Sequence, residues 1–129
     1  MNTPIVIEGA FPRRGRGHAE RPRPSVRVPR IARLLALAWH VEGLVHSGTV
    51  PSYAVAARLG HVSRARMSQI VSLLHLAPDL QEQVLFLKCP ARGREAPTLR
   101  QVSSVAAALD WPEQRRRWRK LRRATSTCP

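Results

Sequence analysis

Residues 52–74 constrain the fold most, because they contain two short helical patterns joined by a sharp turn. The first pattern, residues 53–59, runs into Gly60, and glycine most easily adopts the left-handed backbone that ends a helix. The second pattern follows Ser63, a residue typical of a helix N-cap. Its apolar stripe repeats at helical spacing and consists of Met67, Ile70, Val71 and Leu74. This arrangement predicts a helix-turn-helix.

The other face of the second helix, predicted over residues 63–76, is small and polar. It carries Arg64, Ala65, Arg66, Ser68, Gln69 and Ser72. Such a face can come close to a DNA major groove, where glutamine matches adenine and arginine matches guanine or phosphate. We therefore expect this helix to bind double-stranded DNA. Its expected base readers are Gln69, Arg64 and Ser68, and Arg66 is the expected phosphate contact.

The basic residues of the chain are concentrated in its flanks. The chain carries 22 basic and 8 acidic residues, a formal net charge of +14, and all but two of the basic residues are arginine. Residues 34–87 balance basic against acidic side chains, so the excess lies in residues 1–33 and 88–129. This layout favours a central module that reads sequence and flanks that follow the phosphate backbone. Solubility, or a genome rich in G and C, would also explain the arginines.

Residues 1–28 read as a disordered basic arm, because they are rich in arginine, proline and glycine. A short apolar piece at residues 5–7 could add an edge strand or be unstructured. The tripeptide Arg14-Gly15-Arg16 is similar to a minor-groove hook, with a generic basic tail as the alternative. Arg14 and Arg16 are therefore expected phosphate contacts.

Residues 29–87 are expected to form the DNA-binding core. A helix over residues 29–47 starts at Pro29, ends at Gly48 and is apolar over more than half its circumference, so it should pack against both helices of the motif. Pro78 and Asp79 suit the first turn of a further helix, about residues 79–87, with Leu80, Val84 and Leu87 facing inward.

Beyond a basic loop at residues 88–97, a C-terminal helical pair is predicted over residues 98–124. Thr98 and Gln101 have capping-box spacing and open a helix that continues to Leu109. The last helix opens at Asp110 and has three expected anchors, Trp111, Trp118 and Leu121. Its seven basic residues predict a phosphate-tracking clamp, with a solvated cationic helix as the alternative. The arginines expected to touch phosphate are Arg115, Arg116, Arg117, Arg119 and Arg122.

Residues 57–70, ARLGHVSRARMSQI, followed by SLLHLAPDLQEQV, resemble the helix-turn-helix of the ParB/KorB partition and repressor family. The similarity covers about residues 50–86 and includes Ala56, Gly60, Ser63, the Leu-Leu-x-Leu run and the Pro-Asp step. The resemblance implies that Arg66 lies near a phosphate. It also implies a set of groove-facing positions, Ser63, Arg64, Ala65, Ser68 and Gln69.

Two features depart from the ParB/KorB pattern. His61 is an extra residue that lengthens the turn, and the chain has no room for the nucleotide-binding domain of partition proteins. CTP hydrolysis and spreading are therefore not implied. The whole chain is also similar to small helix-turn-helix proteins associated with serine site-specific recombinases. A recombinase is then an expected partner, and it would supply the cleavage chemistry.

The sequence thus predicts an all-α protein, a compact helical bundle that contains a helix-turn-helix. We expect a bacterial, sequence-specific double-stranded DNA-binding protein, acting as a repressor or as an accessory factor in recombination or partition. A protein- or RNA-interaction module that uses its basic tails is the alternative. A homodimer on paired half-sites also stays open, although no heptad repeat or isolated apolar face marks a dimer interface.

Other classes of function find little support in the sequence. No pairing of Ser, His, Cys or carboxylate residues has a spacing usable for catalysis, so we expect neither an enzyme nor a cofactor. His40, Glu42 and His46 do not share one helical face, so no metal site is expected. The longest apolar run, residues 34–39, is too short to span a membrane. Cys89 and Cys128 read as thiols of a reducing cytoplasm, which suggests a cytoplasmic, nucleoid-associated protein.

Overall fold

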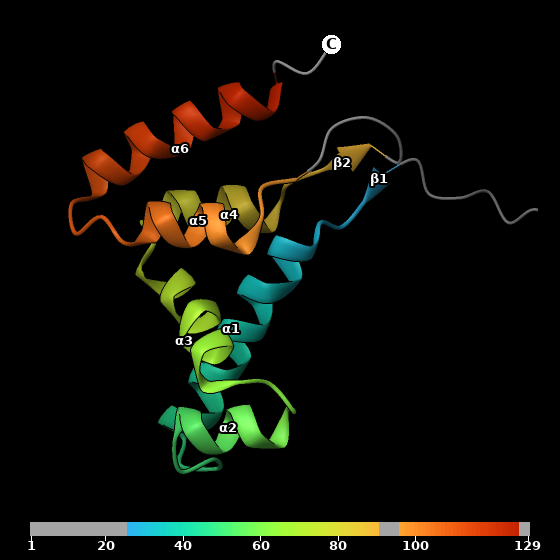
Figure 1. Cartoon of the computed structure of the whole chain (residues 1–129), viewed down its shortest axis with the longest axis vertical. Coiled ribbons are helices and arrows are strands. Elements are labelled where there is room, and N and C mark those ends of the chain that lie inside the picture. The colour runs from blue at the N-terminus through green and yellow to red at the C-terminus, as the bar shows by residue number, and fades with distance from the viewer. Residues whose placement is uncertain (1–25, 91–95, 127–129) are drawn as a thin grey trace, which may run out of the picture.

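A computed structural model describes residues 26–90 and 96–126, and this part of the chain is mostly helical (Figure 1). Its helices are α1 (Arg30–His46), α2 (Tyr53–Leu59), α3 (Arg64–Ser72), α4 (Pro78–Leu85), α5 (Leu99–Ala106) and α6 (Trp111–Ser126). A 3-10 turn, η1 (Leu73–His75), links α3 to α4, and two short strands are β1 (Val26–Arg27) and β2 (Cys89–Pro90). The expected all-α class is confirmed at this level. None of the described helices is long and apolar enough to cross a membrane.

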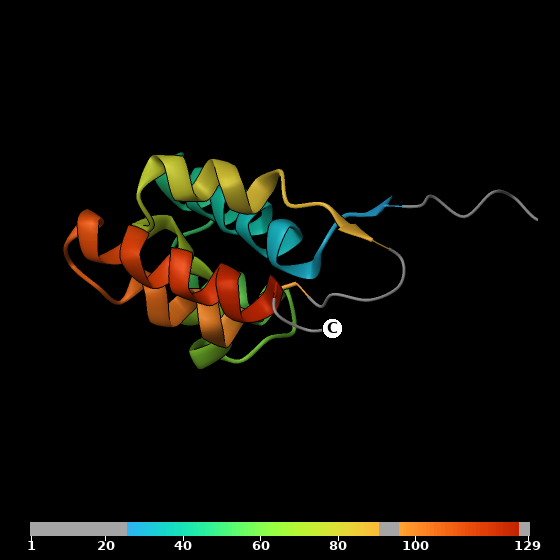
Figure 2. The same ribbon diagram turned by 90° about the horizontal axis from the view of Figure 1, so that it is seen from above.

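The helices pack around α1 and α3 (Figure 1). α1 contacts α3 and α4, while α3 also contacts α2 and α5. α6 packs on α5 and lies at the end of the molecule opposite to α2 (Figure 1). Seen from above, α6 crosses over α5, with α4 to one side (Figure 2). α5 therefore separates α6 from α3.

Two apolar clusters hold this arrangement. The larger one joins α1, α3, η1, α4 and α5 to Trp118 of α6, and its fully buried members include Leu35, Leu73, Val84 and Val102. The smaller one fixes α2 against α1 and α3, and it consists of Val41, Val50, Ala56, Ala57 and Met67. The position of α3 is set from both sides, because it contributes Ile70 to the first cluster and Met67 to the second.

Local signals for helix ends are largely confirmed. The Ser52 and Ser63 hydroxyls accept hydrogen bonds from the backbone N–H groups of Val55 and Arg66, at 3.3 and 3.1 Å. Thr98 and Gln101 form the predicted capping box at the start of α5. Pro78 occupies the first turn of α4, and Gly48, at a φ of 78°, follows α1 in the left-handed conformation.

Two predictions at the C-terminal pair were wrong, and one anchor was not predicted. α5 ends at Ala106 rather than continuing to Leu109, and the Leu109 side chain is fully exposed. Trp111 is half-exposed and does not anchor α6 in the core. Gln114 is the anchor that was missed, because it is only 1% exposed and satisfies backbone groups from other elements.

The boundaries of the N-terminal arm and the basic loop also need correction. Val26 and Arg27, predicted as the end of a disordered arm, pair antiparallel with Pro90 and Cys89 of the predicted loop. This pairing joins segments far apart in the sequence just before the start of α1 (Figure 1). The apolar piece at residues 5–7 and the rest of the arm to residue 25 lie outside the described residues.

Candidate nucleic-acid interface

The turn between α2 and α3 places its left-handed residue at His61, not at Gly60 as predicted. His61 has a φ of 55°, whereas Gly60 has an ordinary φ of −85°. The His61 N–H donates to the Arg58 carbonyl at 3.2 Å, and the Val62 N–H donates to the Ala57 carbonyl at 3.0 Å. These are the two hydrogen bonds of a Schellman motif, in which the residue after the C-cap turns left-handed. The extra turn residue is therefore the one that ends α2.

The orientation of α3 follows from its buried stripe and from the fixation of α2. Met67 and Ile70 are buried as predicted, and Leu73 at the start of η1 continues the stripe. The Tyr53 hydroxyl donates to the Glu42 carboxylate, which ties α2 to α1 and raises the pKa of Tyr53 above its ordinary value. The opposite face of α3 is thereby held outward.

This outward face carries most of the predicted base-contacting residues. The side chains of Ser63, Arg64, Ala65, Ser68 and Gln69 are all exposed. The Ser63 hydroxyl is engaged as the N-cap. Within the described residues, the side chains of Arg64, Ser68 and Gln69 have no hydrogen-bond or ion-pair partner. Their donors and acceptors are free to bind a ligand.

Two arginines near the turn line pockets: Arg58, which was not predicted, and Arg66, the predicted phosphate contact. Arg58, at the end of α2, lines a shallow pocket of about 320 Å³ together with Arg64. Arg58 was not predicted from the sequence, although its place just before the turn could have suggested it. Arg66 is half-buried and lines a different pocket, of about 620 Å³, together with Arg30 and Arg100. No sequence spacing relates residues 30, 66 and 100, so only the fold brings them together.

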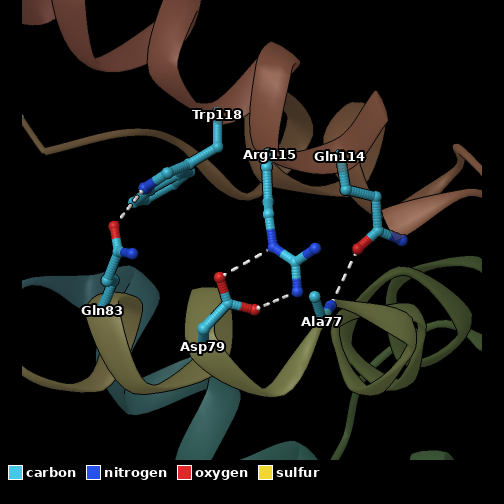
Figure 3. Close-up of polar contacts among 6 residues, drawn as sticks. All are labelled: Ala77, Asp79, Gln83, Gln114, Arg115 and Trp118. Atoms are coloured by element: carbon cyan, nitrogen blue, oxygen red, sulfur yellow. Dashed lines mark hydrogen bonds and ion pairs between the residues drawn. The ribbon is translucent and has the colours of Figure 1, made fainter. Parts of the chain in front are cut away.

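The arginines predicted on the last helix are largely engaged within the molecule. Arg115 forms a two-point ion pair with Asp79 of α4, at 3.0 and 3.1 Å, which holds the pKa of that carboxyl below its ordinary value (Figure 3). Glu113 pairs with Arg116 and also with Arg117, the latter at 3.0 Å. Arg117 also donates to the Ser104 carbonyl of α5 at 3.2 Å.

The other predicted arginines differ in their surroundings. The Arg122 guanidinium lies 5.9 Å from the centre of the Trp118 ring, a cation–π contact. Arg119 is exposed and has no partner among the residues that the structure describes. Arg14 and Arg16, the remaining predicted phosphate contacts, lie outside the described residues.

α6 is held in place by Gln114 and Trp118 (Figure 3). The Gln114 amide oxygen accepts from the Ala77 N–H at 2.8 Å, and its nitrogen donates to the carbonyls of His75 and Ala108 at 3.0 and 2.8 Å. The Trp118 indole N–H donates to Gln83 of α4 at 2.8 Å. These hydrogen bonds dock α6 on the rest of the molecule, so its cationic face has a fixed position.

An apolar pocket of about 690 Å³ lies between α1, η1, α4, α5 and the start of α6. Trp39, Leu109 and Trp111 line it, and all three are exposed. The Trp39 indole N–H donates to Gln81 at 2.9 Å. This pocket was not predicted, because it combines residues from five separate elements, α1, η1, α4, α5 and α6.

Comparisons of the chain with models of protein families, with curated proteins and with solved structures found no match. Among the residues described here, no three His, Cys, Asp or Glu side chains are grouped so that they could hold a metal ion. The interpretation of the site therefore depends on its own geometry.

Proposed function

We propose that this protein binds double-stranded DNA sequence-specifically and reads the major groove with α3, the second helix of a helix-turn-helix. The observation that carries the proposal is the exposed face of α3. It presents Arg64, Ser68 and Gln69 without a side-chain partner among the described residues, while the opposite face is buried. The small Ala65 between them lets the helix approach base edges closely.

Each residue of this face has a separate role in the proposal. Gln69 and Arg64 read bases, since their side chains match adenine and guanine in the major groove. Ser68 adds a shorter hydrogen-bonding group. Ser63 caps α3, and its backbone is placed to approach a phosphate at the helix N-terminus. The resemblance of residues 50–86 to the ParB/KorB helix-turn-helix supports this assignment of roles.

The cellular role proposed is that of a bacterial, nucleoid-associated repressor or accessory factor in recombination or partition. α6, at the far end of the molecule from α2, contributes a second cationic surface that follows the backbone of the same duplex. Either a second copy of the chain or a site-specific recombinase would bind the neighbouring half-site.

The test is selection of binding sites from a randomised duplex pool with the full chain at about 150 mM salt, where nonspecific attraction is weakened. We expect a defined motif, and a two-fold symmetric motif would indicate a dimer. Binding that shows no enrichment and simply decays with salt would contradict the proposal. It would favour the alternative, an interaction module for RNA or protein that acts through its basic tails.

On the selected site, Gln69→Ala should cost about 1–3 kcal/mol at one base position and should relax specificity there. Ser104→Ala is the control, because Ser104 is an exposed polar residue on α5, outside α3, and its side chain has no hydrogen-bond partner among the described residues. The assignment of Gln69 fails if the two variants lose the same affinity, or if Gln69→Ala weakens specific and random DNA equally.

A further inference from the structure

Three arginines from distant parts of the sequence line one open pocket of about 620 Å³. Arg30 starts α1, Arg66 lies in the first turn of α3, and Arg100 lies in the first turn of α5. In both views of the fold, the first turns of α1 and α5 lie side by side (Figures 1 and 2). The floor of the pocket is apolar and includes Ile31, Leu34 and Leu99.

The described residues supply no negative charge to offset the three arginines of this pocket. No acidic residue of the described chain lines it. Within residues 26–90 and 96–126, none of the three guanidinium groups has an ion-pair or hydrogen-bond partner. Like charges gathered around one cavity repel each other, and a bound anion would relieve that repulsion.

Two helix N-termini add to the positive potential. Neither α1 nor α5 has an acidic residue in its first turn. Pro29 makes no side-chain cap at the start of α1, so the first N–H groups there are left to other acceptors. The positive ends of both helix dipoles therefore lie at the rim of the pocket, and no carboxylate in the part of the chain that the structure describes offsets them.

The chemistry of these groups selects the ligand class. Guanidinium groups bind phosphate oxygens through paired N–H donors, and three of them can surround one phosphate group. The apolar floor would accommodate a sugar or a base next to that phosphate. The pocket also lies in the range of about 300–1,000 Å³ typical of small-ligand sites.

We infer that the pocket formed by Arg30, Arg66 and Arg100 is a phosphate-binding site. The phosphate group bound there belongs either to the DNA backbone beside the groove that α3 reads, or to a free nucleotide. The first source depends on the proposed DNA-binding function, whereas the second does not. Because Arg66 belongs to α3, a phosphate in the pocket would bind the same helix that carries Gln69.

The test compares the double variant Arg30→Gln/Arg100→Gln with the wild-type chain. The matched control is Arg33→Gln/Lys88→Gln, which removes the same charge from exposed residues that lie outside α6 and do not line this pocket. Binding of a random-sequence duplex is measured by fluorescence anisotropy across a salt series. Binding of pyrophosphate and of ATP is measured by calorimetry, and thermal melting establishes that all three chains fold.

If a backbone phosphate occupies the pocket, the double variant reduces the salt slope of duplex binding by about one and weakens binding roughly tenfold at 0.1 M salt. The control changes both much less. If a free nucleotide is the ligand, wild type and control bind ATP or pyrophosphate saturably, and the double variant does not. Either result supports a phosphate site.

Equal duplex binding by the double variant and the control, together with no saturable binding of ATP or pyrophosphate, would overturn the inference. That outcome leaves the effect of Gln69→Ala on a selected site untouched. Conversely, a pocket that binds ATP in a chain that selects no DNA motif would contradict the proposed function alone.

Discussion

The two cationic regions of this molecule, α6 and the pocket between α1, α3 and α5, differ in how their charge is compensated. α6 contains the densest run of basic residues in the chain, yet Arg115, Arg116 and Arg117 already pair with Asp79 or Glu113. The pocket has only three arginines, and the described residues offer them no carboxylate. The density of charge along a sequence is therefore a poor measure of the charge available to a ligand.

The difference follows from how each region is built. A run of arginines on one helix repels itself, and nearby carboxylates relieve that repulsion: Glu113 from within α6 and Asp79 from α4. The pocket arginines come from three helix starts, where the first turns hold no acidic residue. Part of the positive charge of α6 is thus paired with carboxylates of the protein. The positive charge of the pocket arginines stays available to an external anion.

The largest expected effect concerns the docking of α6. Gln114→Leu should lower the free energy of unfolding by about 3 kcal/mol, because the Ala77 N–H and the His75 and Ala108 carbonyls lose their buried partner. Urea unfolding of the full chain measures the change. Gln83→Ala, which removes an exposed partner of Trp118, is the control and should cost less than about 1 kcal/mol. Equal losses would mean that Gln114 is not the anchor of α6.

The second prediction compares the loss of duplex affinity caused by changes in the two cationic regions. Replacing the pocket set Arg30, Arg66 and Arg100 by glutamine should weaken binding to all duplex sequences by roughly tenfold at 0.1 M salt and flatten the salt slope by about one. The triple change Arg115/Arg116/Arg117→Gln removes the same formal charge. It should also weaken all sequences, but by less, because these arginines are already paired. A larger loss from the α6 triple would reverse the comparison.

A third prediction separates the stability of the turn from the charge of the pocket. His61→Gly should raise the free energy of unfolding by up to about 1 kcal/mol, because glycine adopts a positive φ without strain. Binding to a random duplex should not change, since the turn and the position of Arg66 are retained. Gly60→Ala is the paired variant and should be tolerated, because its Cβ would lie 3.4 Å from the Ala56 carbonyl oxygen. A severe loss in Gly60→Ala would restore Gly60 as the essential turn residue.

The contrast between local and distant contacts also explains which features the sequence could predict. The caps at Ser63 and Thr98 were predictable, since each residue bonds to a backbone group three positions along the chain. The same local logic failed at Gly60, because composition favours glycine while the hydrogen bonds of the turn place His61 in the left-handed position. Conformational propensity identifies the residue type that adopts a positive φ with the least strain. It does not identify the position at which the chain turns.

Features built from distant segments could not be read from the sequence. Gln114 bonds to residues 37 and 39 positions away, so no pattern within its own helix identifies it as an anchor. The pairing of residues 26–27 with 89–90 and the pocket of Arg30, Arg66 and Arg100 depend in the same way on tertiary packing. The outward face of α3 was predictable, because the 3.6-residue period of one helix is enough to assign it.

The smallest expected effect is the pH dependence of the ion pair that docks α6. The pKa of Asp79 is lowered in the folded chain by hydrogen bonds from Arg115, whereas in the unfolded chain it returns to about its ordinary value of 3.8. A carboxylate of this kind stabilises the fold fully above the unfolded pKa, and the stabilisation is lost as the pH falls through the folded pKa. Because both side chains are nearly half-exposed, solvent screens the pair and the effect is small.

Asp79→Asn should therefore melt slightly below the wild-type chain at pH 7, and the gap should narrow as the pH falls below about 3.8. Arg30→Gln/Arg100→Gln is the comparison variant, and its melting temperature relative to wild type should not change over this range, since no described carboxylate lines the pocket. A gap that narrows for the pocket variant as well would mean that a carboxylate neutralises the pocket in solution. The contrast with α6 would then no longer hold, because the arginines of both regions would already be paired with carboxylates before a ligand binds.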